Sequence, residues 1–104
     1  MINTFDDNNW ENIKKEEISV IQFSASWCSP CKELTPVLEK LSKNFEGKAT
    51  FYYADVEEGG LNKGSELGIR GVPSTILFKR GVEVDRLVGF PGEAKVKEFL
   101  DRNI

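Results

Sequence analysis

Cys28 and Cys31 are the residues whose type and spacing are best suited to chemistry, and the chain has no other cysteine. Only Ser29 and Pro30 stand between them. Residues three apart lie on one face of a helix, where their Cα atoms can approach to about 5.5 Å, a separation that a disulfide accommodates. Forming or breaking the bond would then need little backbone movement. The pair therefore predicts a reversible dithiol–disulfide centre.

A helix should present these cysteines, because apolar side chains recur at helical spacing from Leu34 to Phe45 before Gly47 ends the pattern. The N-terminus of a helix has unpaired N–H groups and the positive end of the dipole, and both favour a thiolate over a thiol. We therefore expect Cys28, at the helix start, to have a lowered pKa and to attack a substrate disulfide. Cys31, one turn deeper, should resolve the mixed disulfide by attacking Cys28.

The remaining patterns predict strands and helices that alternate, followed by a hairpin and a last helix. In chain order, we expect a short helix over Trp10–Lys15 capped by Asp7 or Asn8, strands over Ile18–Phe23 and Ala49–Val56, a helix over Leu61–Leu67, paired strands over Ser74–Phe78 and Val82–Val88, and a helix over Glu93–Arg102. Alternating elements imply parallel strands joined by helical crossovers, and the hairpin adds antiparallel strands. The predicted fold is α/β: one domain over residues 1–104, with a central mixed β-sheet flanked by helices on both faces.

The composition argues against several classes of protein. The net charge is −3 and the basic residues are scattered among acidic ones, unlike the basic stripe of a nucleic-acid-binding protein. The N-terminus lacks the basic start and apolar run of a signal peptide, and no apolar stretch is long enough to span a membrane. We therefore expect a cytoplasmic monomer without nucleic-acid or membrane partners. In that reducing compartment, two close cysteines indicate catalysis or metal binding rather than a structural disulfide.

Zinc binding is the alternative that Cys28 and Cys31 leave open. A structural zinc site needs four ligands, usually two such cysteine pairs or one pair with histidines. This chain has two cysteines and no histidine, so a zinc site would need two copies of the chain to share one metal. The sequence therefore favours redox chemistry, and we expect no bound metal.

The sequence resembles the thioredoxins over nearly its whole length. The resemblance rests on the strand Val20–Phe23, the motif Trp27-Cys28-Ser29-Pro30-Cys31-Lys32, Pro36 in the following helix, Ile69-Arg70-Gly71-Val72-Pro73-Ser74, and Val88-Gly89. It implies the thioredoxin fold and a protein-disulfide reductase with a redox-active disulfide, active in electron transport and cell redox homeostasis. It also implies that client proteins are the substrates, that a thioredoxin reductase recycles the chain, and that no cofactor binds directly.

The resemblance also implies a recognition surface around the cysteines. Its expected members are Trp27, Pro30, Val72, Pro73 and Gly89, with Phe90 as a further candidate. The family carries a cis proline at the position of Pro73, facing the cysteines, which leaves the backbone of Val72 free to pair with an extended substrate segment. We expect Trp27 to be half-exposed, so that its ring can pack against a client.

Two of the positions that depart from the family pattern are Ser29 and Gln22. Ser29 stands where most thioredoxins have Gly, and with Pro30 it should tune the balance between thiolate and disulfide. Gln22 stands where they usually have a buried Asp, which accepts the proton of the resolving cysteine through water. Gln cannot titrate. We expect Gln22 to be buried, not on a solvent face of its strand, to organise a water, and to leave the proton of Cys31 to another base or to solvent.

Two alternatives share the fold. A glutaredoxin-like enzyme would bind glutathione through basic residues and usually carries Cys-Pro-Tyr-Cys, whereas this chain has Trp-Cys-Ser-Pro-Cys. A thioredoxin-fold module that binds a partner without turnover is the second alternative. The two cysteines argue against such a module, while Gln22 leaves it open. An isomerase or oxidase would more often carry His between the cysteines and a secretion signal.

Overall fold

The computed structural model describes residues 1–104 and contains one five-stranded sheet in the order β1-β3-β2-β4-β5. The strands are β1 (Ile2–Thr4), β2 (Ile18–Ser24), β3 (Thr50–Asp55), β4 (Ser74–Lys79) and β5 (Val82–Val88). Strands β1, β3 and β2 run parallel, whereas β4 is antiparallel to both β2 and β5. The expected mixed sheet is therefore confirmed, with the hairpin at one edge.

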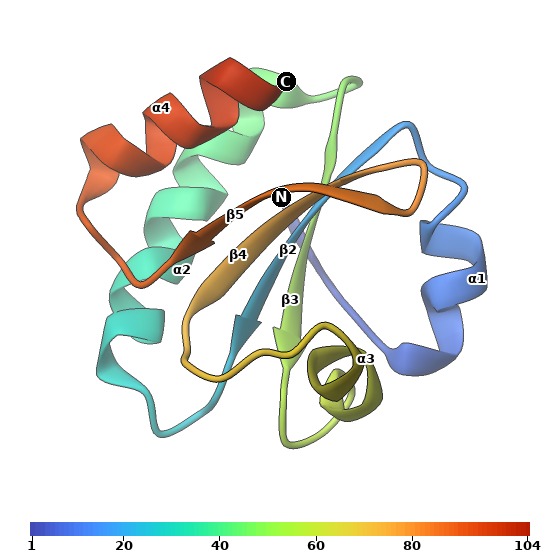
Figure 1. Cartoon of the computed structure of the whole chain (residues 1–104). Coiled ribbons are helices and arrows are strands. Elements are labelled where there is room, and N and C mark those ends of the chain that lie inside the picture. Colours follow the sequence, from blue (N-terminus) through green and yellow to red (C-terminus); the bar gives the residue numbers. More distant parts are fainter.

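Helices cover both faces of this sheet, as expected. They are α1 (Trp10–Ile13), α2 (Ser29–Ser42), α3 (Leu61–Glu66) and α4 (Glu93–Asn103), with short 3₁₀ turns over Asp7–Asn9 and Lys43–Phe45. Figure 1 shows α2 and α4 on one face and α1 and α3 on the other. The helices are too short or too polar for any of them to cross a membrane.

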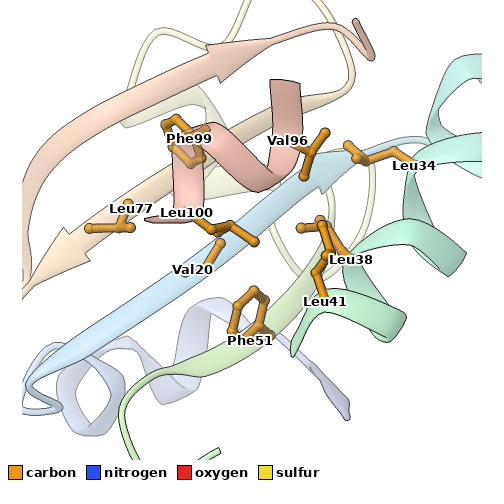
Figure 2. Packing of buried hydrophobic residues seen from close by; sticks show 9 residues of the cluster. All are labelled: Val20, Leu34, Leu38, Leu41, Phe51, Leu77, Val96, Phe99 and Leu100. Atoms are coloured by element: carbon orange, nitrogen blue, oxygen red, sulfur yellow. The ribbon is translucent and has the colours of Figure 1, made fainter. Parts of the chain in front are cut away.

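The central strand β2 separates two hydrophobic cores because its side chains alternate between the faces. Val20 belongs to the core beneath α2 and α4, which Figure 2 shows packed around Leu38, Leu100 and Phe99. Ile21 and Phe23 belong to the core on the α1 side. By the same alternation, Gln22 faces α2, the helix that carries the cysteines.

Two features of the N-terminal segment differ from the expectations. Strand β1 did not stand out in the sequence because it has only three residues; it joins the sheet by pairing Ile2 with Phe51 of β3. The expected caps Asp7 and Asn8 are also wrong for α1, because Asn9 is its N-cap residue and makes no side-chain capping hydrogen bond. Asp6 caps the preceding 3₁₀ turn by accepting the N–H of Asn8 at 2.8 Å.

Asp7 caps a different helix, α3. Its carboxylate oxygens accept the backbone N–H groups of Asn62 and Lys63, each at 2.9 Å. These are unpaired donors in the first turn of α3, where an acidic group is also favoured by the dipole. The segment after β1 is thereby attached to the helix that precedes the Arg70–Pro73 loop.

Candidate redox site

Cys28 and Cys31 form a disulfide at the start of α2. Cys28 is the N-cap residue, with φ −89° and ψ 111°, and Cys31 lies in the first helical turn. Their Cα atoms are 5.3 Å apart, close to the separation that the sequence predicts for a disulfide. Both residues are buried, Cys28 at 4% exposed and Cys31 at 1%. The expected placement of the pair at a helix N-terminus is therefore confirmed.

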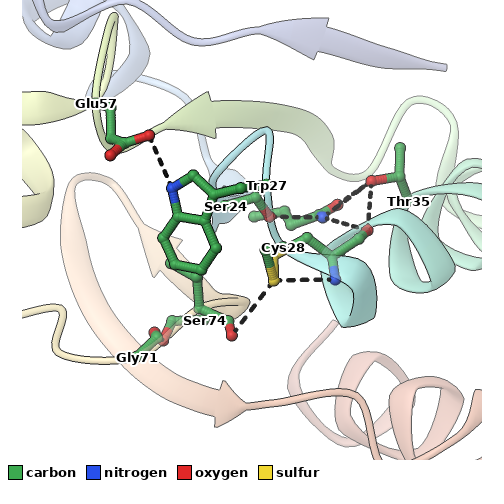
Figure 3. The surroundings of a disulfide bond; sticks show 10 residues. Ser24, Trp27, Cys28, Thr35, Glu57, Gly71 and Ser74 are labelled. Carbon is green, nitrogen blue, oxygen red and sulfur yellow. Dashed lines mark hydrogen bonds between the residues drawn. A yellow bond between two sulfur atoms is a disulfide. The ribbon is translucent and has the colours of Figure 1, made fainter.

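Two backbone groups approach the Cys28 sulfur, as the dashed lines in Figure 3 show. The N–H of Cys31 donates to Sγ at 3.3 Å, which is the hydrogen bond of an N-cap side chain to the first helical turn. The carbonyl oxygen of Val72 lies 3.6 Å from the same sulfur. An N–H donor and the positive end of the helix both stabilise negative charge on this sulfur when the disulfide is reduced.

The loop before β4 faces the disulfide. The Val72–Pro73 peptide bond is cis, as the resemblance implies, and Val72 packs against the small buried cluster of Ala25, Cys28 and Cys31. Two hydrogen bonds hold this loop: Ser74 Oγ donates to the Gly71 carbonyl at 2.7 Å, and the Gly89 N–H donates to the Pro73 carbonyl at 2.8 Å. Gly89 has φ +84°, a left-handed conformation that suits glycine.

Trp27 is more exposed than the expected half, at 66%. Its indole Nε1–H donates to Glu57 Oε1 at 2.9 Å, and the backbone N–H of Glu57 in turn donates to Asp55 Oδ1 at 2.8 Å. This contact joins the loop before α2 to the loop after β3 (Figure 3). A tryptophan held by its polar edge, with its ring in solvent, is able to contact a docked chain.

The structure gathers most of the expected recognition residues around the sulfurs. Trp27 and Pro30 are exposed, while Val72 and Gly89 are partly buried and Pro73 is buried. Phe90 differs, because it packs against the core beneath α2 and α4. The candidate recognition surface thus consists of Trp27, Pro30, Val72, Pro73 and Gly89.

Gln22 is fully buried behind the cysteines, which rules out a solvent-facing position. Its Nε2 contacts Ser24 Oγ at 2.8 Å, Thr35 Oγ1 at 3.0 Å and the Cys31 carbonyl oxygen at 3.3 Å. The Thr35 hydroxyl contacts the same Cys31 carbonyl at 2.9 Å. The amide therefore bonds directly to protein groups on β2 and α2.

The sequence reasoning missed Ser24 and Thr35, although signals for both were present. Ser24 follows Gln22 by two residues and so lies on the same face of β2. Thr35 follows Cys31 by four residues and so lies on the same face of α2. No group of three or more His, Cys, Asp or Glu side chains is placed to hold a metal ion.

Comparison with known proteins shows that this chain is similar to thioredoxins over nearly its whole length. The family model described as Thioredoxin matches residues 1–102. A thioredoxin of Staphylococcus haemolyticus is 35% identical over 98 residues, which cover 94% of this chain and 93% of that protein. Thioredoxins of Staphylococcus aureus are 34% identical over the same shares. The crystal structure of Malassezia sympodialis thioredoxin (Mala s 13) matches with a TM-score of 0.88 and 30% identity, covering 98% of this chain and 90% of that one.

Proposed function

This chain belongs to the thioredoxin family of thiol–disulfide oxidoreductases, and from that premise we propose that it reduces disulfides in client proteins, with Cys28 as the nucleophile and Cys31 as the resolving cysteine. The observation that carries the proposal is the position of the disulfide, with Cys28 as the N-cap of α2 and Cys31 in its first turn. The N-cap sulfur accepts an N–H hydrogen bond, whereas Cys31 is almost fully buried at 1% exposed. These differences support an outer attacking sulfur and an inner resolving one.

The reaction proceeds in two exchange steps. The thiolate of reduced Cys28 attacks one sulfur of the client disulfide, a mixed disulfide forms, and the other client sulfur leaves as a thiolate that takes a proton. Cys31 then loses its proton and attacks the Cys28 sulfur. The Cys28–Cys31 bond forms, the mixed disulfide breaks, and the second client thiolate leaves. Two electrons pass to the client, and the chain ends in the disulfide form.

The recognition surface supplies contacts for an extended client segment. The carbonyl of Val72 lies next to the attacking sulfur, so a client backbone N–H that pairs with the Val72 backbone is held beside Cys28. Trp27, Pro30, Pro73 and Gly89 surround this point with mainly apolar groups. A surface with few polar groups does not select one client sequence, which suits the reduction of many different clients.

The remaining assignments extend the family membership. Thioredoxins need no bound cofactor, and we propose that a thioredoxin reductase returns electrons to the Cys28–Cys31 disulfide after each turnover. We also propose that residues 1–104 act as one domain and as a monomer, in the cytoplasm, in electron transport for redox homeostasis. Ser29 and Gln22 are proposed to tune the dithiol.

Reduction of insulin with dithiothreitol as the electron source tests the proposal. The parent should accelerate insulin precipitation, and Cys28→Ser should abolish the acceleration. Reduced Cys31→Ser, mixed with insulin after the dithiothreitol is removed, should accumulate a mixed disulfide on Cys28. No acceleration by the parent would favour a binding module without turnover. Activity only when glutathione is supplied would favour a glutaredoxin-like enzyme.

A further inference from the structure

We propose that Thr35 and Gln22 are positioning residues that hold the backbone of Cys31 at the site of attack, in the dithiol as well as in the disulfide form. This inference rests on the proposed function, in which Cys31 resolves the mixed disulfide. The hydroxyl of Thr35 and the amide of Gln22 converge on one atom, the carbonyl oxygen of Cys31, at 2.9 and 3.3 Å. One of these groups comes from α2 and the other from β2.

The number of N–H and O–H protons on Gln22 and Thr35 indicates which group donates in each hydrogen bond of the network. The Gln22 amide has two N–H groups, and its two shorter contacts are Ser24 Oγ at 2.8 Å and Thr35 Oγ1 at 3.0 Å. When Thr35 Oγ1 accepts from Gln22, its single hydroxyl proton can go to the Cys31 carbonyl at 2.9 Å or to Gln22 Oε1 at 3.3 Å, and the shorter contact favours the carbonyl. Both N–H groups of Gln22 are then used, so Gln22 acts on the Cys31 carbonyl mainly through Thr35. A continuous path of hydrogen bonds thus joins the centre of the sheet to the backbone of Cys31.

Pro36 makes this attachment more important. Proline has no N–H, so the carbonyl of Lys32 lacks its usual donor four residues later in α2. The first turn of α2 is therefore less firmly joined to the rest of the helix. The hydrogen bonds from Gln22 to Thr35 and from Thr35 to the Cys31 carbonyl instead connect that turn to β2, the central strand.

Reduction leaves the network intact because none of its atoms is a sulfur. Gln22, Ser24 and Thr35 are also neutral at every working pH, so neither redox state nor pH changes their hydrogen bonds. Resolution then starts with Cys31 already near Cys28, and less conformational entropy is lost when the two sulfurs meet. A looser Cys31 would resolve more slowly and form its disulfide less favourably.

The reaction of the reduced protein with Ellman's reagent separates the two steps. Attack by Cys28 releases the first aromatic thiolate, and attack by Cys31 on the mixed disulfide releases the second. Thr35→Val keeps the side-chain shape and removes the hydroxyl, so the second phase should slow about 3- to 10-fold, the effect of one lost hydrogen bond. The first phase should stay within about twofold of the parent, and Thr35→Ser should restore the second.

Equilibration with glutathione gives a second readout, since it measures how favourably the two thiols form their disulfide. Thr35→Val should lower that equilibrium constant by a similar 3- to 10-fold, a shift of about 15–30 mV. Thr35→Ala, a better helix former, should do the same. A role in stability alone would change the melting temperature but neither the second phase nor the glutathione equilibrium.

Three results would overturn the inference: an unchanged second phase in both Thr35→Val and Thr35→Ala, an equal slowing of both phases, or a Thr35→Ser variant as slow as Thr35→Val. These results differ from a failure of the proposed function. If the parent itself does not reduce insulin, or if Cys31 rather than Cys28 attacks first, the proposed function is wrong. A parent that resolves quickly and variants that match it refute only the positioning role.

Discussion

The sulfur of Cys28 lies 3.6 Å from the carbonyl oxygen of Val72, although 44 residues separate the two along the chain. Cys28 begins α2, and Val72 precedes β4, which pairs antiparallel with the strand leading into α2. The sheet topology therefore places the reactive sulfur beside a backbone group that can hold a substrate. A client segment bound at Val72 lies where Cys28 can attack it.

Trp27 should contribute to client binding and little to stability. Because its side chain is exposed, Trp27→Ala should leave the melting temperature nearly unchanged. It should raise KM for insulin about 5- to 10-fold, as expected when an aromatic contact is removed from an interface. Trp27→Phe keeps an aromatic ring but cannot bond to Glu57, so it should raise KM less than Trp27→Ala does. A Trp27→Ala variant with the KM of the parent would exclude Trp27 from the recognition surface.

A carboxyl group at position 22 should make the rate of insulin reduction depend on the protonation of that group. Burial raises the pKa of a carboxyl group, so the new side chain in Gln22→Asp should titrate above the ordinary value of about 3.9. At a pH above its raised pKa, the carboxylate can accept the proton of Cys31, and insulin reduction should be faster. Gln22→Asn has the same length but cannot titrate, so it controls for the disrupted hydrogen bonds. Identical pH–rate profiles for the two variants would contradict this prediction.

Asp85 should stabilise the attachment of α4 to β5 in a pH-dependent way. Its carboxylate accepts hydrogen bonds from Asn103 at 2.8 Å and from Arg102 at 2.9 Å. The Asn103 bond, then the backbone N–H of Arg86 and the guanidinium of Arg102, lower the pKa of Asp85. Because the folded pKa lies below the unfolded value of about 3.9, this stabilisation is complete above that pH and is lost as the pH falls through the folded value.

Urea unfolding of Asp85→Asn measures this effect. At pH 7 the free energy of unfolding should fall by about 0.5–1 kcal/mol, a modest loss because the groups are partly exposed to solvent. The difference from the parent should shrink as the pH is lowered below about 4. Glu98→Gln is the matched control, since the contact of Glu98 with Arg102 is longer, at 3.8 Å, and its loss should have a smaller effect. A loss of the same size at pH 7 and at pH 2 would contradict the account.

Local patterns in the sequence predicted most of the fold. The strand over Val82–Val88 has the expected bounds, and the helix after the cysteines ends before Gly47, because these features depend on nearby residues. Strand β1 could not be predicted from its three residues, since its pairing with β3 defines it. Asp7 likewise caps a helix 55 residues away, a contact that no local pattern contains.

The chemistry of the site was predictable for a related reason. Cys28 and Cys31 are close in sequence, and a helix start determines their geometry. The surroundings of Gln22 were harder to predict, because Thr35 approaches it only once α2 lies on the sheet. The resemblance to a family indicated that Gln22 is unusual, and the three-dimensional structure identified its partners.

The rates at which the two thiols of the reduced protein are alkylated test the central claim most directly. Iodoacetamide labelling across pH, with peptide mapping to assign each label, gives separate values for Cys28 and Cys31. Cys28 should react at least about tenfold faster at pH 7, with a midpoint below the value of about 8.5 for an ordinary cysteine. Equal and slow labelling of both thiols, or faster labelling of Cys31, would contradict the account.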